Sequence, residues 1–533
     1  SSAVQIGDPI TQKKMIDMVL EARDLGLIQV ITDNGAGGLS SSVGEMAELT
    51  GGADLDLSVV PLKQAGLSAW EILVSESQER MTIGVSTADC EAFEKLAVLH
   101  EVEATAVGTF TDSGSFIVRF GEQTVADLPI SFLYDGCPQL QLESEWIPPI
   151  HEPIIFPQVN ANEFGEILCR LMARPNVASK EWWVRSYDHE VIAQSVIKPF
   201  GGVNHDAPGD AAVIAPIQGQ TQGAVISNGI APRYSDIDAY AMAAASIDEA
   251  LRNAVCVGVD LDLIAGLDNF CWPDPVESAK TPDGRYKLAQ LVRANRALDD
   301  ICRAYNLPCI SGKDSMKNDA ILDGKKISVP PTLLFSLIGN HSDVRKAVSS
   351  DFKNVGDHIY LLGETHQELG ASELAFMFRD ESNGRSGIGG TIPEIDAKRN
   401  LSMYRSLTAA MGAGLVASAH DCSDGGLATT VAECCFGCDS GSIIDISPIT
   451  SDCSHIDSWG ALFGESLGRI LVSVKPTDSV AFEASMKGHA CYKLGRVESG
   501  DNITFNNGND SVMTASMSAL RVAWKGTLDG GTN

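Results

Sequence analysis

Residues 31–48 read ITDNGAGGLSSSVGEMAE, and residues 419–436 repeat that pattern as AHDCSDGGLATTVAECCF. Asp33 aligns with Asp421, and the Gly-Gly-Leu that follows recurs at the same offset of 388 residues. An acidic residue ahead of a glycine turn and a helix is typical either of a tight turn or of a site for phosphate or metal. A repeat at one fixed spacing indicates a duplicated domain.

Two further blocks carry the repeat. Asp8 aligns with Asp396 upstream, and downstream LVSESQERMTIGV (73–85) aligns with LFGESLGRILVSV (462–474), now 389 residues apart. The paired positions in the downstream block are Glu76 with Glu465, Ser77 with Ser466, and Arg80 with Arg469. Three blocks in the same order, with one slipped residue, favour duplication over chance.

Each copy predicts the same order of elements. In the first copy we expect a helix over roughly 10–25, a short apolar strand, the glycine turn, a second helix, and a strand over 79–85 with alternation of period 2. Strands that alternate with helices predict an α/β layer domain. A proline-rich run from 137 to 157 predicts a linker between the first copy and a middle segment.

Composition excludes several classes of function. The net charge of −31 argues against nucleic acid as a partner, and it suits carboxylates that hold Mg²⁺. The sequence contains no apolar run long enough to span a membrane, and its first residues lack the basic and apolar regions of a signal peptide. The 13 cysteines, with Cys434, Cys435 and Cys438 as the tightest group, are interpreted as a reduced and mostly buried set rather than a zinc site.

The middle segment carries candidates of its own. Asp210 stands at the head of an apolar strand, and residues 235–260 predict a long helix. Glu249 and Asn253 are one turn apart on that helix, so together they could hold a hard cation. A solvated helix face explains the same pair, and from spacing alone it is the favoured interpretation.

A second candidate in the middle segment is NLPCISGKDSMKND (306–319), which predicts a strand that runs into a turn at Gly312, Lys313, Asp314 and Ser315. Backbone amides, a lysine and a hydroxyl in such a turn could approach a phosphate. The spacing is not that of a Walker A loop, so the signal by itself is weak.

In this order, the motifs AVQIGDP, DNGAGGL, WEILVSESQERM, GKDSMKND and HDCSDGGL resemble the phosphoribosylformylglycinamidine synthase family over nearly the whole chain. The resemblance implies an α/β (α+β) fold of AIR-synthase-like type, with a ferredoxin-like A domain flanked by two α/β B domains. It implies a first B domain at 1–150, a second A domain at 151–345 and a second B domain at 346–533. A first A domain, which carries the catalytic residues in the family, is expected ahead of residue 1.

The resemblance also implies a reaction of de novo purine biosynthesis. ATP phosphorylates the amide oxygen of formylglycinamide ribonucleotide, and ammonia derived from glutamine then displaces phosphate. Carried over by motif, the substrate contacts would be Gln5, Glu76, Ser77, Gln78 and Ser315, and the ATP contacts would be Asp268, Gly312 and Lys313. Asp33 would hold Mg²⁺, while Lys313 stands where short forms of the family carry asparagine, which puts a metal role there in doubt.

A second, auxiliary nucleotide site with ADP and Mg²⁺ is implied as well. Its metal contacts would be Asp210, Glu249, Asn253 and Asp421, and its nucleotide contacts would be Ala211 and Ser423. The implied partners are the ribonucleotide, a separate glutaminase subunit and the N-terminal part of the synthase, all in the cytoplasm. Two alternatives stay open: a non-catalytic nucleotide-binding fragment, and another ATP-dependent member of the same superfamily.

Overall fold

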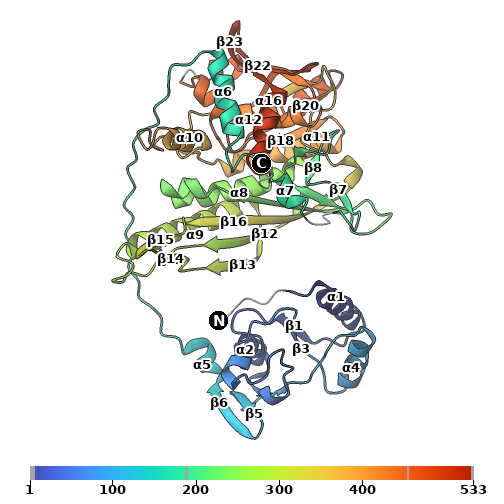
Figure 1. Cartoon of the computed structure of the whole chain (residues 1–533). Helices are drawn as coiled ribbons and strands as arrows, with labels where there is room; N and C mark the ends of the chain where they lie inside the picture. Colours follow the sequence, from blue (N-terminus) through green and yellow to red (C-terminus); the bar gives the residue numbers. More distant parts are fainter. Residues whose placement is uncertain (1–6, 187–189, 453–454, 530–533) are drawn as a thin grey trace. The chain divides into compact units, whose positions relative to one another are not determined.

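The computed structural model describes residues 7–186, 190–452 and 455–529 of the chain (Figure 1). The chain divides into two compact units, residues 1–141 and residues 142–533. Among the described residues, no helix is long and apolar enough to cross a membrane. The division of the chain at 150 and 345 into three domains stays a prediction.

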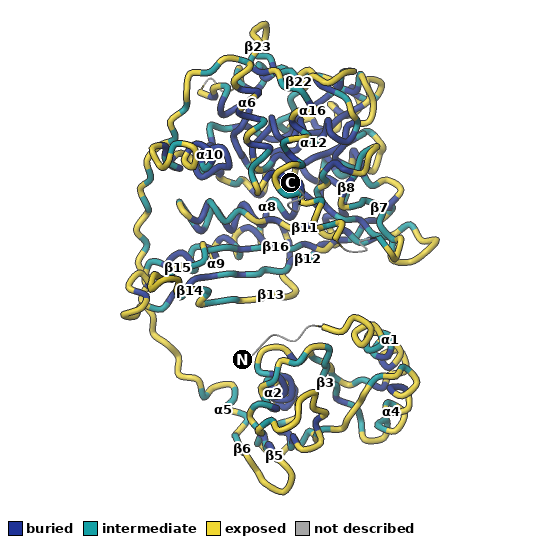
Figure 2. Tube along the Cα trace, viewed as in Figure 1, coloured by how far each residue is buried: buried dark blue, intermediate teal, exposed yellow. Residues whose placement is uncertain are grey.

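Unit 1 is the first copy of the repeat. Its elements are α1 (Pro9–Asp24), β1 (Val30–Asp33), α2 (Leu39–Thr50), β2 (Ala53–Asp56), η1 (Leu57–Val59), α3 (Ala69–Leu73), β3 (Met81–Gly84), α4 (Cys90–Leu99), β4 (Gly108–Phe110), β5 (Ser115–Phe120), β6 (Gln123–Pro129) and α5 (Ile130–Asp135). The strands form two separate sheets, β1-β3 and β4-β2-β5-β6. Buried residues gather around α2, with a smaller group at α1 and α4; Figure 2 colours the chain by burial.

The first half of unit 2 is built on one mixed sheet. Its elements are α6 (Ala161–Met172), α7 (Glu181–Val184), β7 (Ser195–Ile197), β8 (Phe200–Gly201), β9 (Ala207–Pro208), β10 (Ala212–Ile214), β11 (Gly223–Ile230), η2 (Pro232–Asp236), α8 (Ala239–Cys256), β12 (Asp260–Cys271), α9 (Gly284–Tyr305), β13 (Cys309–Ser315), β14 (Asp319–Leu322), β15 (Lys325–Ser328), β16 (Thr332–His341) and η3 (Val344–Lys346). The sheet order is β13-β12-β16-β11-β10-β7. The alanine-rich α8 is capped by Asp238, packs on β11 and β16, and is almost entirely buried.

The second half of unit 2 is the second copy of the repeat. Its elements are β17 (His358–Leu362), α10 (Glu373–Glu381), α11 (Ala397–Gly412), β18 (Ser418–Asp421), α12 (Gly426–Phe436), β19 (Gly441–Asp445), α13 (Ser447–Asp452), α14 (Ser458–Phe463), β20 (Ile470–Val474), α15 (Ser479–Ser485), β21 (Cys491–Glu498), β22 (Asn502–Asn507), β23 (Asp510–Ser516) and α16 (Met517–Gly526). One seven-stranded sheet, β18-β20-β17-β21-β19-β22-β23, runs through it.

The two copies share their local geometry. Asp33 pairs with Met81 across β1 and β3, and Asp421 pairs with Ile470 across β18 and β20, which reproduces both the 388 and the 389 offset. β2 lies between an antiparallel and a parallel neighbour, as does β19. The helices that follow the glycine turns, α2 and α12, also correspond. The duplication and the α/β fold class are therefore confirmed.

Two details of the sequence-based prediction were wrong. Gly312 to Ser315 do not form a turn after a strand, because they lie within β13 and pair in parallel with Asp268–Cys271 of β12. The helix expected over 235–260 covers only α8, since Asp238 caps its start and Gly258 adopts a φ of +91° just beyond its end.

The proline-rich linker has neither helix nor regular strand between α5 and α6. From Glu143 onward it lies on unit 2: the Glu145 amide donates to the carbonyl oxygen of Arg285, and the Trp146 ring stacks on Tyr286 at 5.5 Å. The linker prediction agrees with this extended course. All described cysteines are free thiols, and only Cys137 and Cys309 among them are exposed.

Candidate functional site

The glycine turn of unit 1 packs against the loop that starts at Ser75. Gly38 has a φ of +55°, and a Cβ atom there would lie 2.2 Å from the carbonyl oxygen of Ser75, so only glycine fits. Arg80 holds the same loop, because its guanidinium donates to the carbonyl oxygens of Ser75 and Ser77. The turn after Asp33 and the segment Glu76–Gln78 are therefore brought together.

In unit 2 an arginine holds the corresponding loop in the same way, and this arrangement is called the arginine clamp below. Arg469 donates to the carbonyl oxygens of Gly464 and Ser466, and a Cβ atom on Gly426 would lie 2.5 Å from the oxygen of Gly464. Each of these atoms is the counterpart of one in unit 1. The Glu-Ser-x-x-Arg pattern thus encodes a loop shape that both copies keep.

The predicted substrate contacts of unit 1 are accessible. Asp33, Glu76 and Gln78 are exposed, and Ser77 is half-buried with its hydroxyl 2.9 Å from that of Ser75. Gln5 lies outside the described residues. The exposed side chains among them can be reached from solvent, as a ligand contact requires, and the roles of all these residues stay predictions.

The predicted ATP contacts lie on two neighbouring strands of unit 2. Asp268 of β12 pairs with Gly312 of β13, and a Cβ atom on Gly312 would lie 3.0 Å from the Asp268 carboxylate. Gly312 and Lys313 are exposed, while the Ser315 hydroxyl contacts Asn318. Partial burial, with a smaller contribution from the Asp314 carboxylate, raises the pKa of Asp268.

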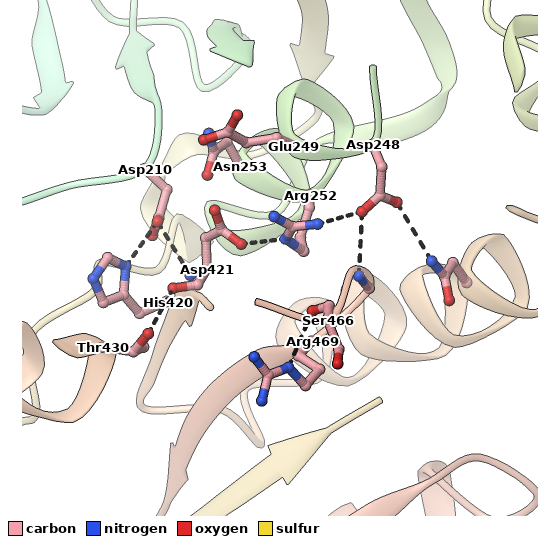
Figure 3. Close-up of polar contacts among 12 residues, drawn as sticks. Asp210, Asp248, Glu249, Arg252, Asn253, His420, Asp421, Thr430, Ser466 and Arg469 are labelled. Carbon is pink, nitrogen blue, oxygen red and sulfur yellow. Dashed lines mark hydrogen bonds and ion pairs between the residues drawn. The ribbon is translucent and has the colours of Figure 1, made fainter. Parts of the chain in front are cut away.

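The predicted auxiliary site gathers inside unit 2, between α8 and the end of β18 (Figure 3). Asp210 accepts hydrogen bonds through Oδ1 from His420 Nδ1 at 2.7 Å and from the Asp421 amide at 3.1 Å. Its Oδ2 is buried without a hydrogen-bond partner. His420 also contacts Glu433 at 3.1 Å, and although burial opposes its charge, the Asp210 carboxylate helps to raise the pKa of His420 well above its usual value.

Glu249 and Asn253 lie beside these groups. Glu249 Oε2 accepts a hydrogen bond from the Ile230 amide at 2.8 Å, and Asn253 Nδ2 donates to the carbonyl oxygen of Asn228 at 3.0 Å. Burial, followed by the carboxylate of Asp421, raises the pKa of Glu249 well above its ordinary range. The ionised form of a carboxyl group held in this way is stabilised by any nearby positive charge.

An arginine joins the metal candidates to a second carboxylate. Arg252 is 1% exposed and donates to both Asp248 and Asp421 (Figure 3). Asp248 is fully buried and also receives hydrogen bonds from the hydroxyls of Tyr305 and Tyr404 and from the Gly468 amide. Asp248 and Arg252 thus tie α8 to α9, α11, the end of β18 and the loop before β20.

The chemistry of these donors fits a hard divalent cation. Carboxylate and amide oxygens are the ligands that Mg²⁺ prefers, and the unpartnered Oδ2 of Asp210 leaves one such oxygen unsatisfied. Among the described residues, however, no three His, Cys, Asp or Glu side chains lie close enough together to form a metal site as they stand. These residues supply suitable oxygen atoms, which would have to move closer together to coordinate an ion.

The remaining two residues of the set lie beside the carboxylates. Ala211 follows Asp210 and is 9% exposed, and Ser423 lies half-buried between Asp421 and the glycine turn. The structure therefore brings all six auxiliary-site candidates together within one unit.

Sequence reasoning assigned no role to Arg252 or to its partner Asp248. Their spacing of four residues on one helix was a visible signal, since it places a carboxylate and a guanidinium on the same face. It could not show that Asp421, 169 residues further on, shares the same arginine. His420 is buried between Asp210 and Glu433.

The two copies use one glutamate differently. Glu76 is exposed, whereas its counterpart Glu465 is 3% exposed and accepts from the amides of Glu373 and Gly425 and from the Tyr234 hydroxyl. Burial raises the pKa of Glu465 to about 8. The glutamate side chain that is exposed in unit 1 is thus part of the core in unit 2.

Comparison with known families agrees with this duplicated scaffold. The family described as AIR synthase related protein, C-terminal domain, matches residues 1–121 and 354–506, which is more than half of the chain. The corresponding N-terminal domain family matches residues 208–332. The chain therefore belongs to the AIR synthase related family.

Within that family, the chain is similar to the phosphoribosylformylglycinamidine synthase subunit PurL. It is 32% identical to PurL of Anaeromyxobacter sp. (strain Fw109-5), over 98% of this chain and 66% of that protein. It is 30% identical to PurL of Thermoplasma volcanium, over 99% of this chain and again 66% of the relative. The chain thus spans just under two thirds of the length of these relatives.

Solved structures share the fold. The structure of PurLQS from Thermotoga maritima has a TM-score of 0.61 and 20% identity, and the match covers 93% of this chain and 68% of that one. T. maritima PurL complexed with ATP gives the same four values. The complex with FGAR differs only in that 66% of its chain is covered.

Proposed function

We propose that this chain forms part of a phosphoribosylformylglycinamidine synthase, a carbon–nitrogen ligase with glutamine as amido donor. The proposed reaction is the ATP-dependent conversion of formylglycinamide ribonucleotide and glutamine-derived ammonia to formylglycinamidine ribonucleotide in de novo purine biosynthesis. One observation carries the proposal: identity of about a third to PurL subunits extends over 98% of the chain. The loop held by Arg80 in unit 1 supports it.

The exposed residues of that loop suit a ribonucleotide. In this proposal Glu76, Ser77 and Gln78 contact the substrate, as do Gln5 and Ser315. A carboxylate, a hydroxyl and an amide fixed on one clamped loop can accept and donate hydrogen bonds to ribose and amide groups. The printed hydrogen bonds of Arg80 go to backbone oxygens of the loop, so the arginine fixes the path of the chain without occupying the Glu76 carboxylate.

Phosphoryl transfer needs positive charge and fixed donors near the transferring oxygens. Asp268, Gly312 and Lys313 are proposed to line ATP, with Lys313 supplying charge directly. Asp33 is proposed to hold Mg²⁺, which when bound would neutralise phosphate oxygens. The amide oxygen of the ribonucleotide substrate takes the phosphoryl group from ATP. Ammonia then adds to the amide carbon, and the phosphorylated oxygen leaves as phosphate.

The auxiliary site is proposed to hold ADP with Mg²⁺. Its metal contacts would be Asp210, Glu249, Asn253 and Asp421, and its nucleotide contacts would be Ala211 and Ser423. The buried, unsatisfied Oδ2 of Asp210 supports this assignment. The proposed partners are a glutaminase subunit and the remaining third of the relatives' length, and the cytoplasm is the proposed location on the strength of the same relatives.

Activity tests the main proposal. ATP, Mg²⁺, ammonia and the ribonucleotide are supplied to the chain, with and without the N-terminal third of a PurL relative. Turnover is expected only in the mixture. Turnover by the chain alone would overturn the idea that the active site needs that segment, and no turnover in either would count against the synthase.

A substitution sharpens this assay. Glu76→Ala is expected to lower turnover of the mixture about 100-fold, because a positioning contact is lost. Glu122→Ala is the matched control, since Glu122 is an exposed glutamate of the same unit between β5 and β6. Equal effects of the two changes would remove Glu76 from the site.

A nucleotide-binding fragment without catalysis is the second candidate, and the gathering of the four proposed metal contacts Asp210, Glu249, Asn253 and Asp421 in unit 2 (Figure 3) favours it. ADP is expected to copurify with the chain and to appear on denaturation. Glu249→Gln should reduce the ADP recovered, while Glu166→Gln, an exposed glutamate on α6, should not. ADP retention without turnover in the complemented assay would select this candidate.

A further inference from the structure

Two cysteines of unit 2 lie with their sulfur atoms close together. Cys302 is three residues before the end of α9, Cys309 is the first residue of β13, and their Sγ atoms are 3.9 Å apart. Both are free thiols. A disulfide bond needs an Sγ–Sγ distance of about 2.0 Å, so the sulfurs have to approach by roughly 2 Å, which rotation of the two side chains about their Cα–Cβ bonds can supply.

The turn between the two cysteines explains why they meet. Asn306 ends α9 in the left-handed conformation, with a φ of +54°, and the Leu307 amide donates to the carbonyl oxygen of Cys302 at 2.9 Å. This is the hydrogen bond of a Schellman turn. Beyond it, the Gly266 amide donates to the carbonyl oxygen of Pro308 at 2.8 Å, which aligns the start of β13 on β12. The contact between the two sulfurs is thus built into the backbone of the fold.

The two thiols differ in access. Cys309 is exposed, whereas Cys302 is only 9% exposed. An oxidant in solution therefore meets Cys309 first and leaves Cys302 as the second thiol, which attacks the oxidised sulfur. Burial raises the pKa of both thiols, so at neutral pH they are protonated and react more slowly than the low-pKa cysteines of fast redox sensors.

The other cysteines do not share this arrangement. Among the residues that the structure describes, Cys302 and Cys309 are the one pair of thiols in hydrogen-bond contact with each other. Other cysteine sulfurs with a hydrogen bond contact oxygen or nitrogen atoms, as at Cys90, Cys271 and Cys435. Exposure of one thiol and a second sulfur beside it are therefore combined at Cys309.

We propose that Cys302 and Cys309 form a reversible disulfide when the chain meets hydrogen peroxide. The Cys309 sulfur takes one oxygen of the peroxide and becomes a sulfenic acid, while the other oxygen leaves as water. The Cys302 sulfur then attacks the Cys309 sulfur, the S–S bond forms, and the sulfenic oxygen leaves as a second water with the proton of the Cys302 thiol. In total the two thiols lose two electrons and two hydrogens, and peroxide is reduced to two waters.

The disulfide would close a ring over residues 302–309 and tie the end of α9 to the first residue of β13. A dithiol reductant would open the ring again by thiol–disulfide exchange. The modification does not depend on the proposed reaction, because it needs only two sulfurs and an oxidant.

Peptide mapping of the full chain tests the proposal. The chain is treated with hydrogen peroxide, the remaining thiols are alkylated under denaturing conditions, and trypsin is added without reductant. Because Arg303 separates the two cysteines, trypsin releases residues 297–303 and 304–313 as different peptides with one cysteine each. Mass spectrometry is expected to find these two peptides joined at least about tenfold more often than any other pair, since the partner thiol is held in place. Dithiothreitol should separate them.

Cys137→Ser is the matched control, because Cys137 is the other exposed cysteine among those described. This change should leave the yield of the joined peptides unaltered, whereas Cys309→Ser should abolish it and leave the buried Cys302 as a thiol. Peptides that stay separate, with Cys309 unreacted or carried on to a sulfinic acid, would overturn the proposal. Joining of Cys309 mainly to Cys137 would also overturn it, since exposure alone would then govern the reaction.

Discussion

The most demanding single residue in unit 2 is Arg252. It lies 1% exposed between Asp248 and Asp421 and donates to both. Two buried carboxylates share one guanidinium, and Asp248 is satisfied further by two tyrosine hydroxyls. Removal of the arginine leaves two buried charges without compensation, which is far more costly than the loss of a surface ion pair.

We expect Arg252→Met to lower the free energy of unfolding by about 3–5 kcal/mol, measured by urea denaturation. Arg303→Met is the matched control. Arg303 forms an i,i+4 pair with Asp299 on α9, but both side chains are more than half exposed, so the change should cost less than about 0.5 kcal/mol. Similar losses for the two variants would contradict the assigned role of Arg252.

His341 gives a second residue-scale prediction. Its Nδ1 accepts a hydrogen bond from the Asp343 amide, and its Nε2 lies 3.2 Å from the carbonyl oxygen of Val257. That arrangement requires the neutral imidazole, and burial lowers the pKa of His341 below 6.5. Below pH 6.5 the unfolded chain therefore binds a proton that the folded chain excludes, so stability falls as the pH falls.

The measurement compares unfolding of the unmodified chain and of His341→Gln at pH 7.5 and at pH 5.5. The unmodified chain should lose more stability between these two values than the variant does. An equal or larger loss in the variant would show that His341 contributes nothing to the acid sensitivity.

At the scale of elements, the glycine turns set how each β-strand passes into its helix. Gly426 combines a φ of +67° with a backbone carbonyl oxygen 2.5 Å from the place of a Cβ atom. Gly414 has a similar φ of +75°, but nothing lies within 4 Å of its Cβ position. Substitutions at these two glycines therefore distinguish the cost of a positive φ from the cost of a steric clash.

Gly414→Ala should cost about 1–2 kcal/mol, the price of a left-handed residue with a side chain. Gly426→Ala should cost at least about 2 kcal/mol more, because the opposing atom is backbone and cannot rotate away. Thermal and urea unfolding of both variants provide the values. Equal losses of stability in the two variants would show that the loop at Gly464 shifts readily to make room for the added Cβ atom.

The sequence predicted the elements that depend on local pattern. The strand–turn–helix around Asp33, its twin at Asp421 and the duplicated order all follow from residue types and one spacing. The extent of β13 was misjudged because Gly312, Asp314 and Ser315 are typical turn residues, and only pairing with Asp268–Cys271 of β12 keeps them extended. Tertiary pairing of this kind leaves no mark in local sequence.

The candidate site was predictable to the same degree. Residues that resemble family motifs could be named, and the auxiliary set does gather in unit 2. The sharing of Arg252 by Asp248 and Asp421, and the burial of Glu465, depend on contacts between segments far apart in sequence. Such contacts decide which member of a repeated pair is exposed, and spacing cannot reveal them.

For the whole molecule, the division into two units predicts where a protease cuts first. Residues 137–142 have no helix or strand, and Leu140 is 72% exposed. Brief treatment with chymotrypsin should therefore cut after Leu140 or Leu142 and leave a resistant fragment that starts near residue 142, identified by mass spectrometry. The double change Leu140→Ser and Leu142→Ser should slow this cut, and a first cut inside unit 2 would contradict the division.

The arginine clamp on the Glu-Ser loop has a consequence for how the two copies could diverge. Within the loop, Arg80 and Arg469 bind main-chain oxygens, so they keep the shape of the loop whatever side chains it presents. Evolution could then assign the glutamate to solvent in one half and to the interior in the other without altering the path of the chain. The duplication thus preserved the backbone conformation of the loop and left its side chains free to take different roles.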